Sequence, residues 1–292
     1  MDAISVYGAS SVKRRRRTKA ELAALDEIIV GVCDEENPIS VRGVYYRVVS
    51  AGAIDKTEAA YKTISRRLKE LRLEGRVPYH WITDGTRLTR KPETWSTVET
   101  MLADAAASYR RALWDNQEVE VIVLSEKDAI SGVIFPVTAA WDVELGIARG
   151  YSSITFAHSI AGTVTRNTRR GKTTVLYNLG DHDPSGLDAW RDFQRKVRDF
   201  APDGLVEFDR LAVTEQQIVE WDLPTHPTKG TDSRSKNFIG ASVEVDAIPS
   251  PRLRQLVTDA IEKHIDHHEL MLTKAVEEQE RDMLTQLVGG AQ

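Results

Sequence analysis

From residue 118 onward, short apolar runs alternate with segments of helical periodicity, and this alternation restricts the possible folds more than any other feature of the chain. A run that is apolar on both faces is typical of a strand buried in a parallel sheet. VEVIVL (119–124) is such a run, and three further strands are expected, with the sequences SITFA (153–157), TTVLYNL (173–179) and LVEFDRLAV (205–213). Helices are expected after the first strand to about residue 148, over about 185–200, and over about 251–288. The pattern predicts an α/β domain with a mostly parallel sheet.

The residues before this domain have the pattern of three helices and a hairpin. The helices are expected over residues 20–33, 41–52 and 57–73. Ser40 begins the second helix and Asp55 or Thr57 the third, because their side chains can cap a helix, and glycines follow both helices. In HWITDGTRLTR (80–90), Asp84-Gly85 is typical of a two-residue turn between short strands. Three helices and a hairpin predict a winged helix-turn-helix domain of the α+β class, which commonly places its third helix on DNA.

These patterns divide the chain into four parts. A basic N-terminal arm (1–19) and a winged-helix domain (20–94) precede a connecting helix (95–117) and the α/β domain with its C-terminal helices (118–292). Residues 1–115 hold 20 Lys and Arg against 16 Asp and Glu, a charge of +4, which leaves 19 against 28, or −9, for the remainder. The basic half is suited to facing phosphates and the acidic half to holding cations.

Cysteine and hydropathy patterns exclude several classes of protein. Cys33 is the one cysteine, so neither an internal disulfide nor a cysteine-rich zinc site is expected. The chain has no run of about 18 apolar residues, and its basic start lacks the apolar core of a secretory signal. We therefore expect no membrane partner and a cytoplasmic setting.

Three carboxylates follow the predicted strands. Glu126 comes just after the first strand in LSEKDA, and Asp181 and Asp183 come just after the third in NLGDHDPSG. Ligand sites in open parallel sheets lie at the carboxyl ends of strands. Converging carboxylates repel one another unless a cation lies between them, and oxygen-only ligands suit Mg²⁺, with Mn²⁺ as an alternative ion. The competing interpretation is that Asp181 and Asp183 only cap the next helix.

Two adjacent tyrosines lie on the second helix. On a helical wheel Tyr45 falls among valines on the apolar side, whereas Tyr46 falls at its margin, one turn after Arg42. Tyr45 is therefore predicted to lie in the core, and Tyr46 to be exposed beside a cation. A guanidinium can stabilise a phenolate and bind a phosphate. The alternative is that both tyrosines pack in the core.

Two basic surfaces are candidates for contact with DNA. Lys62, Arg66 and Lys69 fall opposite the apolar face of the third predicted helix, and a solvated face usually mixes charges of both signs. The run Lys13–Arg17 in the N-terminal arm includes Arg14, Arg15 and Arg16. Both surfaces are interpreted as phosphate contacts, with ordinary solvated surface as the alternative.

Taken together, these motifs resemble a known family. SEKDA followed by GDHDPSG is similar to the Toprim domain of topoisomerases, primases and some nucleases. An Arg, three residues and a Tyr on the second helix of a winged helix resemble the A subunit of type IIB topoisomerases (topoisomerase VI) and the meiotic double-strand-break proteins. The segments RLAVTEQQIVEWDLPTHPTKGTDSR and EVDAIP also look like that family. The resemblance covers about residues 38–265 and is nearest to the compact Mini-A members; Gly43 stands where the family usually has an acidic residue.

The resemblance implies a function and partners. It implies Mg²⁺-dependent double-strand DNA cleavage in which Tyr46 is the nucleophile and forms a 5′-phosphotyrosyl link. Arg42 and Lys127 would support this step. The metal would be bound by Glu126, Asp181 and Asp183. The resemblance also implies a homodimer that joins Tyr46 of one copy to the carboxylates of the other, a nucleoid-associated location and the possibility of a separate ATPase subunit. The alternatives are a non-catalytic DNA-binding protein that keeps the fold, and a Toprim nuclease or primase.

Overall fold

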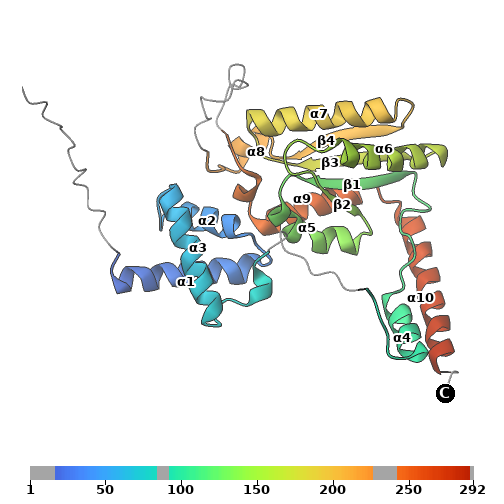
Figure 1. The fold of residues 1–292 in the computed structure, drawn as a ribbon, viewed down its shortest axis with the longest axis horizontal. Helices are drawn as coiled ribbons and strands as arrows, with labels where there is room; N and C mark the ends of the chain where they lie inside the picture. Colours follow the sequence, from blue (N-terminus) through green and yellow to red (C-terminus); the bar gives the residue numbers. More distant parts are fainter. Residues whose placement is uncertain (1–16, 84–91, 226–241, 290–292) are drawn as a thin grey trace, which may run out of the picture.

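The computed structural model describes residues 17–83, 92–225 and 242–289 (Figure 1). Most of the expected N-terminal arm, including Arg14, Arg15 and Arg16, lies outside these residues, as does the expected turn at Asp84-Gly85. The wing of the expected winged helix and the basic arm therefore remain predictions.

A four-stranded parallel sheet forms the centre of the larger part of the chain. Its strands are β1 (Val119–Ser125), β2 (Glu144–Ile147), β3 (Thr173–Leu179) and β4 (Val206–Ala212), in the order β2-β1-β3-β4. β1 and β3 pair along their whole length, and the last five residues of β1 are all buried. Burial on both faces explains why the central strands are apolar at successive positions. The predicted α/β class with a parallel sheet is confirmed.

Helices cover both faces of this sheet (Figure 1). On one face, α5 (Asp128–Ala140) and α9 (Ser250–Glu262) pack against Val121, Val123 and Val175. On the other face, α6 (Ile154–Arg169) and α7 (Pro184–Phe200) pack against Ile122, Leu124 and Leu176. Alternate residues of β1 thus enter opposite cores, as the period of two in a strand requires. A short helix, α8 (Glu215–Glu220), follows β4.

The N-terminal part is a group of three helices, as predicted. These are α1 (Lys19–Glu36), α2 (Val41–Ser50) and α3 (Glu58–Leu73). Thr18, Ser40 and Thr57 cap them, each accepting a hydrogen bond from a backbone N–H three residues later. Gly52 and Gly75 follow α2 and α3 with φ of +70° and +75°, a conformation that favours glycine.

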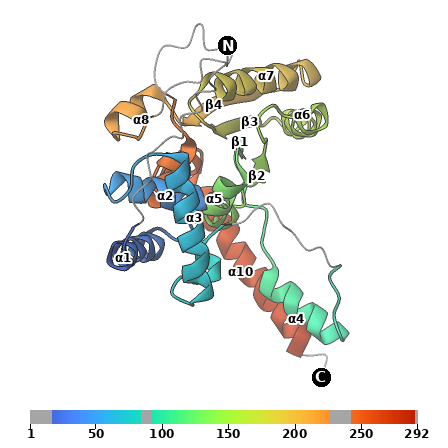
Figure 2. The same ribbon diagram turned by 60° about the vertical axis from the view of Figure 1, so that its left-hand side comes forward.

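A third part is an arm of two helices that projects from the body (Figures 1 and 2). It consists of α4 (Val98–Ser108) and α10 (His267–Gly289), which pack against each other although they are far apart in sequence. The expected connecting helix is thus shorter than predicted, because Ser108 is its last residue. In the part of the chain that the structure describes, no helix has both the length and the apolar composition needed to span a bilayer.

One predicted strand is wrong, and one strand was missed. Residues 153–157 begin α6, because the Ser153 side chain accepts the backbone N–H of Phe156 and caps a helix there. The second strand is instead β2, which lies within the stretch predicted to be helical up to residue 148. It has only four residues and pairs with one neighbour, β1, so its sequence carried too little periodicity to reveal it.

The segment that was expected to begin the hairpin is not a strand in its described part. Residues Tyr79–Trp81 form the 3-10 helix η1, and Ile82 makes an isolated parallel bridge with Ile39 at the start of α2. Aromatic and β-branched residues in HWIT suggested a strand, but the tertiary contact with Ile39 decides the local conformation.

Candidate active site at the carboxyl ends of β1 and β3

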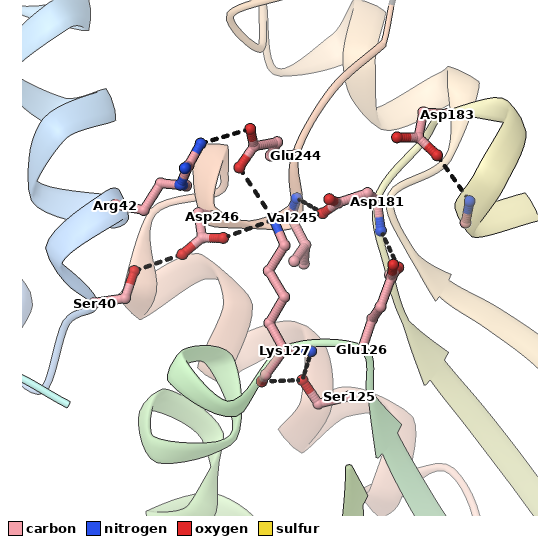
Figure 3. A network of polar contacts seen from close by, with 12 residues as sticks. Ser40, Arg42, Ser125, Glu126, Lys127, Asp181, Asp183, Glu244, Val245 and Asp246 are labelled. Atoms are coloured by element: carbon pink, nitrogen blue, oxygen red, sulfur yellow. Dashed lines mark hydrogen bonds and ion pairs between the residues drawn. The ribbon is translucent and has the colours of Figure 1, made fainter. Parts of the chain in front are cut away.

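The carboxyl ends of β1 and β3 lie side by side and bring Glu126 and Asp181 together. The Glu126 backbone N–H donates to the carbonyl of Leu179 at 2.9 Å, and the Glu126 carboxylate accepts the backbone N–H of Asp181 at 3.0 Å (Figure 3). Glycine allows this close approach: a Cβ on Gly180 would lie 2.8 Å from a Glu126 carboxylate oxygen, and one on Gly186 would lie 2.5 Å from the Asp181 carbonyl. The two residues lie together at this edge, but the Glu126 carboxylate meets the backbone of Asp181, whereas the Asp181 carboxylate binds Lys127 and the Val245 N–H.

Asp183 has the capping role that the competing interpretation gave it. Its carboxylate accepts the backbone N–H of Gly186 at 2.7 Å and begins α7. In Figure 3 this side chain lies on the far side of Asp181 from Lys127. Capping engages one of its two carboxylate oxygens, so the role of a helix cap and that of a metal ligand are compatible.

Lys127 is the cation at the centre of the site. Its ammonium lies 2.8 Å from Asp181, 3.1 Å from Glu244 and 3.0 Å from Asp246 (Figure 3). Burial by itself would lower the pKa of Lys127, but Asp246, Asp181 and Glu244 outweigh it and hold this pKa well above its ordinary value. Lys127 is therefore charged at neutral pH, and it neutralises carboxylates that would otherwise repel one another.

Glu244 and Asp246 are site residues that the sequence analysis did not identify. They lie at and just before the 3-10 helix η3 (Val245–Ala247), whose first backbone N–H donates to Asp181 at 2.9 Å. EVDAIP entered the sequence analysis only as part of the resemblance. Its acidic residues are two apart, like Asp181 and Asp183, and this spacing was the available signal.

These two acidic residues also join the N-terminal helices to the α/β domain. Arg42 on α2 donates to Glu244 at 2.8 Å, and the Ser40 hydroxyl donates to Asp246 at 2.5 Å. Lys127 touches both carboxylates. A continuous polar network therefore runs from the start of α2 to the end of β3 within one copy of the chain (Figure 3).

Tyr46 lies beside this network, but it is buried, so its predicted exposure is wrong. It is 2% exposed and Tyr45 is 5% exposed, and their rings are 5.2 Å apart. Helical-wheel position could not reveal that η3 packs on α2 and covers the margin of its apolar face. Tyr45 has the core role expected of it, and its hydroxyl donates to the carbonyl of Thr57 at 3.3 Å.

The electrostatic surroundings of Tyr46 oppose its ionisation in this conformation. Burial and the charge of Glu244 raise the pKa of Tyr46 above its usual range, while Arg42 and Lys127 act in the opposite direction. Tyr46 is therefore a neutral phenol here. Glu244 and Asp246, which act on the charge of Lys127, also act on Tyr46. Because burial is the largest cause, activating Tyr46 requires greater exposure of its hydroxyl or a stronger influence of the two cations.

Arg210 is a further cation at this edge of the sheet, and it was not identified from the sequence. It lies on β4, and its guanidinium donates to the carbonyls of Gly180 and Asp181 and to the side chain of Asn178. Burial lowers the pKa of Arg210, and the charges of Glu126 and the two aspartates oppose that effect. The signal was an arginine within a strand predicted to be buried. Arg210 holds the loop that carries Asp181 and Asp183.

The donor chemistry of the three predicted ligands fits a hard divalent cation. Burial, followed by the charge of Asp181, raises the pKa of Glu126, and burial also raises the pKa of Asp181. A cation beside these carboxylates would reverse both effects. Across residues 17–83, 92–225 and 242–289, however, no group of three His, Cys, Asp or Glu side chains is arranged so that it could hold a metal ion. Lys127 and the Val245 N–H both bind the same oxygen of Asp181, so a metal at this carboxylate would lie close to the Lys127 charge.

The predicted basic face of the third helix is present on α3. Lys62, Arg66 and Lys69 are exposed, while Ile64 and Leu68 are buried on the other side. Arg67 has a structural role instead, because it pairs with the buried Asp26. The structure does not bring the three exposed cations into the carboxylate site; they form a separate surface.

Comparisons of the chain with protein-family models, with curated proteins and with solved structures found no match.

Proposed function

We propose that this chain binds double-stranded DNA and cleaves its backbone with Tyr46 as the nucleophile. The observation that carries the proposal is that Tyr46 lies beside a network of two cations and several carboxylates, at the edge of a parallel sheet where ligands usually bind. The resemblance to the type IIB topoisomerase A subunit, with its winged-helix and Toprim domains, supports the same assignment. The exposed basic face of α3 would hold the duplex.

In the cleavage step, the Tyr46 oxygen forms a bond to phosphorus, and the bond from phosphorus to the 3′ oxygen breaks. The product is a 5′-phosphotyrosyl link and a free 3′ hydroxyl. The phenolic proton passes to a carboxylate, and Glu244 is the carboxylate whose charge acts most strongly on the phenol. The leaving 3′ oxygen takes up a proton from solvent, which balances the step.

Arg42 and Lys127 would bind the attacked phosphate. Arg42 is the more accessible of the two, with 36% of its side chain exposed against 26% for Lys127. A phosphate reaching Arg42 competes with Glu244 for the guanidinium and can accept two parallel hydrogen bonds from it. Separating Glu244 from Arg42 also frees Glu244 to accept the phenolic proton.

Glu126, Asp181 and Asp183 would hold Mg²⁺ or Mn²⁺. A bound divalent ion supplies positive charge that stabilises the charge developing on phosphate oxygens. The carboxylates themselves fix the loop after β3, and Arg210 keeps that loop in place through its carbonyls.

The resemblance also implies a homodimer with sites shared between copies, and a separate ATPase subunit. The network within one copy favours a different arrangement for the site, because Tyr46 and Lys127 already act on each other within a single chain. A site completed within one copy and a site shared by two copies can be distinguished by mixing two inactive variants, because only a shared site would recover activity in the mixed dimer.

A second candidate function is DNA binding without cleavage. The burial of Tyr46 favours it, as does the ion pair between Lys127 and Asp181, because both keep the reactive groups occupied. This candidate keeps the basic face of α3 and gives the carboxylate network a purely structural role.

Duplex DNA labelled at the 3′ end of one strand separates these candidates. A 5′-phosphotyrosyl link retains the 3′-labelled fragment, so label should migrate with the protein in denaturing electrophoresis after incubation with Mg²⁺ or Mn²⁺. Tyr46→Phe should abolish that band, and the matched variant Tyr45→Phe should keep it. Label lost in Tyr45→Phe but kept in Tyr46→Phe would reverse the assignment. Cut DNA without attached label would indicate a nuclease, and intact bound DNA would favour the non-catalytic function.

A further inference from the structure

The arm formed by α4 and α10 carries an unusual concentration of exposed apolar side chains. Of the 16 large apolar residues that are exposed in the described part of the chain, eight lie on the arm or directly before it. They are Trp95, Val98, Met101, Met271, Leu272, Val276, Met283 and Leu287. Exposed apolar surface concentrated on one element usually marks an interaction site.

Most of these side chains lie on one face. Leu272, Val276, Met283 and Leu287 follow spacings of four, seven and four, as in the seam of a coiled coil. At about 100° per residue they fall within a sector of about 60°. Val98, Met101 and Ala105 lie within a similar sector of α4 and are also exposed. We call these seven residues the arm face.

The two sectors form one continuous surface because the helices are antiparallel. Tyr109, just after α4, bonds to Glu280, and Arg111 bonds to Glu277, so the chain after α4 runs toward the start of α10. The side of each helix that contacts the other carries Ala106 on α4 and Thr273 on α10. Viewed from the N-terminus of each helix, the apolar sector lies about 100° around the helix from this contact side, in the same direction of rotation for both helices. In an antiparallel pair, equal rotations bring both sectors to the same side.

The charges of the arm favour a second copy of this chain as the occupant. α10 has seven charged residues, but none of them lies within the sector between Leu272 and Leu287, which Gln279 borders on one side and Glu280 on the other. A symmetric pair places the same surface against itself, so charges on that surface would repel. Glu280, the acidic residue that borders the sector, is already bonded to Tyr109 and Arg111 within the arm.

The arm is also thinly packed without such a partner. α4 has 11 residues and buries one of them, Ala106, and helices of this length are marginally stable alone. The arm face covers about 23 Å of α10 and about 11 Å of α4, or about 340 Å² per copy at about 10 Å per helix. Two copies would bury about 700 Å² if each surface were flat, and interdigitating side chains raise this area toward the lower limit of specific interfaces, about 1,200 Å².

We infer that the arm face binds a second copy of this chain, so that two arms pack as a four-helix bundle. Packing of this kind buries the exposed seam of each α10 against helices of the other copy. The inference does not depend on DNA cleavage, because it concerns only the surface of the arm.

Sedimentation equilibrium of the full chain without DNA tests the inference. The wild type should form dimers in the micromolar range. Met283→Glu should weaken dimerisation at least about tenfold, because it places a charge in the apolar seam. Met271→Glu is the matched control: it makes the same change on the same helix, about 120° away, and should shift the dissociation constant less than about twofold.

Gln279→Lys provides a second variant that removes no apolar side chain, so it should weaken the dimer while α10 stays folded by circular dichroism. A wild type that is monomeric throughout would overturn the inference, as would dimers insensitive to both Met283→Glu and Gln279→Lys. A dimer that leaves DNA uncut would count against the proposed function alone, and a monomer that cuts DNA would count against this inference alone.

Discussion

The Lys127 ammonium lies 2.8 Å from the Asp181 carboxylate, at the edge of the sheet where a divalent cation is expected from the sequence. Lys127 directly follows Glu126, so a residue that the resemblance assigned to phosphate binding is bonded to an expected metal ligand. The protein thus carries its own cation among these carboxylates. Binding of metal or phosphate at this edge has to compete with that ion pair.

Replacing Lys127 with Met should destabilise the protein strongly. The change leaves Asp181 and Asp246 without their cation, while Glu244 keeps Arg42, and breaking a buried ion pair typically costs about 3–5 kcal/mol. We expect about 3 kcal/mol, because Lys127 is partly exposed. Urea denaturation measures the loss. The control Lys62→Met, on an exposed face, should change the free energy of unfolding by less than about 0.5 kcal/mol, and a similar small effect at Lys127 would show that the ion pairs contribute little.

Magnesium binding should respond in opposite directions to two changes at the site. Lys127→Met removes the competing cation and should tighten Mg²⁺ binding in calorimetric titration. Asp181→Asn combined with Asp183→Asn removes two ligands and should abolish specific binding. Asp188→Asn with Asp192→Asn, on the outer part of α7, is the control and should bind as the wild type does. Equal affinity in all four proteins would exclude the proposed ligands.

The stability of the protein should depend on pH through Glu126. Its pKa is raised in the folded protein by burial and by Asp181, so the folded state binds its proton more tightly than the unfolded state does. Its contribution to stability is therefore complete below the unfolded pKa, about 4.3, and is lost as pH rises through the folded pKa. Glu126→Gln should be more stable than the wild type at neutral pH without metal, and the difference should shrink as pH falls toward 4.3.

Chemical denaturation at several pH values, without divalent ions, measures this difference. The side-chain oxygen of Gln can still accept the Asp181 N–H, so the variant keeps the local hydrogen bond. Glu99→Gln is a control, because this carboxylate is fully exposed, and its pKa is lowered by local hydrogen bonds rather than raised. A Glu126→Gln variant that is less stable at neutral pH would show that a favourable interaction of the charged carboxylate outweighs its burial and its repulsion by Asp181.

The central strands and the position of the carboxylates could be predicted from sequence because both depend on local patterns. β1 and β3 are apolar at successive positions, and Glu126 and Asp181 follow them directly. The caps at Ser40 and Thr57 were recognisable for the same reason. These features depend on neighbours within a few residues.

Features that depend on distant contacts could not be predicted in this way. Tyr46 is buried because η3, about 200 residues later, packs on α2. Glu244 and Asp246 become site residues only where Lys127 and Arg42 reach them. The position of β2 is fixed by pairing with β1 rather than by its own four residues. In each case the deciding interaction joins parts of the chain whose proximity has no signature in sequence spacing.

The basic face of α3 should contribute to DNA binding without a role in chemistry. Changing Lys62, Arg66 and Lys69 together to Ala should weaken affinity for any duplex and reduce the slope of log affinity against log salt by about 2.7, or about 0.9 per lost contact. Fluorescence anisotropy over a range of salt concentrations measures both quantities. A triple control at Arg191, Arg195 and Lys274, which are exposed elsewhere, should leave the slope unchanged. Equal slopes in both triple variants would remove α3 from the DNA interface.

Mixing two inactive variants should show whether one copy completes the site. Tyr46→Phe lacks the nucleophile, and Glu126→Gln lacks a carboxylate, so each alone should give no covalent DNA adduct. If the site is shared between copies, a mixed dimer has one site that is fully intact, and about half of the chains in a random mixture form such dimers. If both groups act within one copy, every site in every dimer lacks one of them. The network from Arg42 through Glu244 to Lys127 lies within one chain, so we expect no recovery on mixing.

Denaturation and refolding of the mixed chains ensures exchange, and a mixture of wild type with Glu126→Gln, treated identically, is the positive control. Adduct formation by the two mixed variants at about a quarter of the wild-type level would show instead that Tyr46 of one copy reaches the carboxylates of the other.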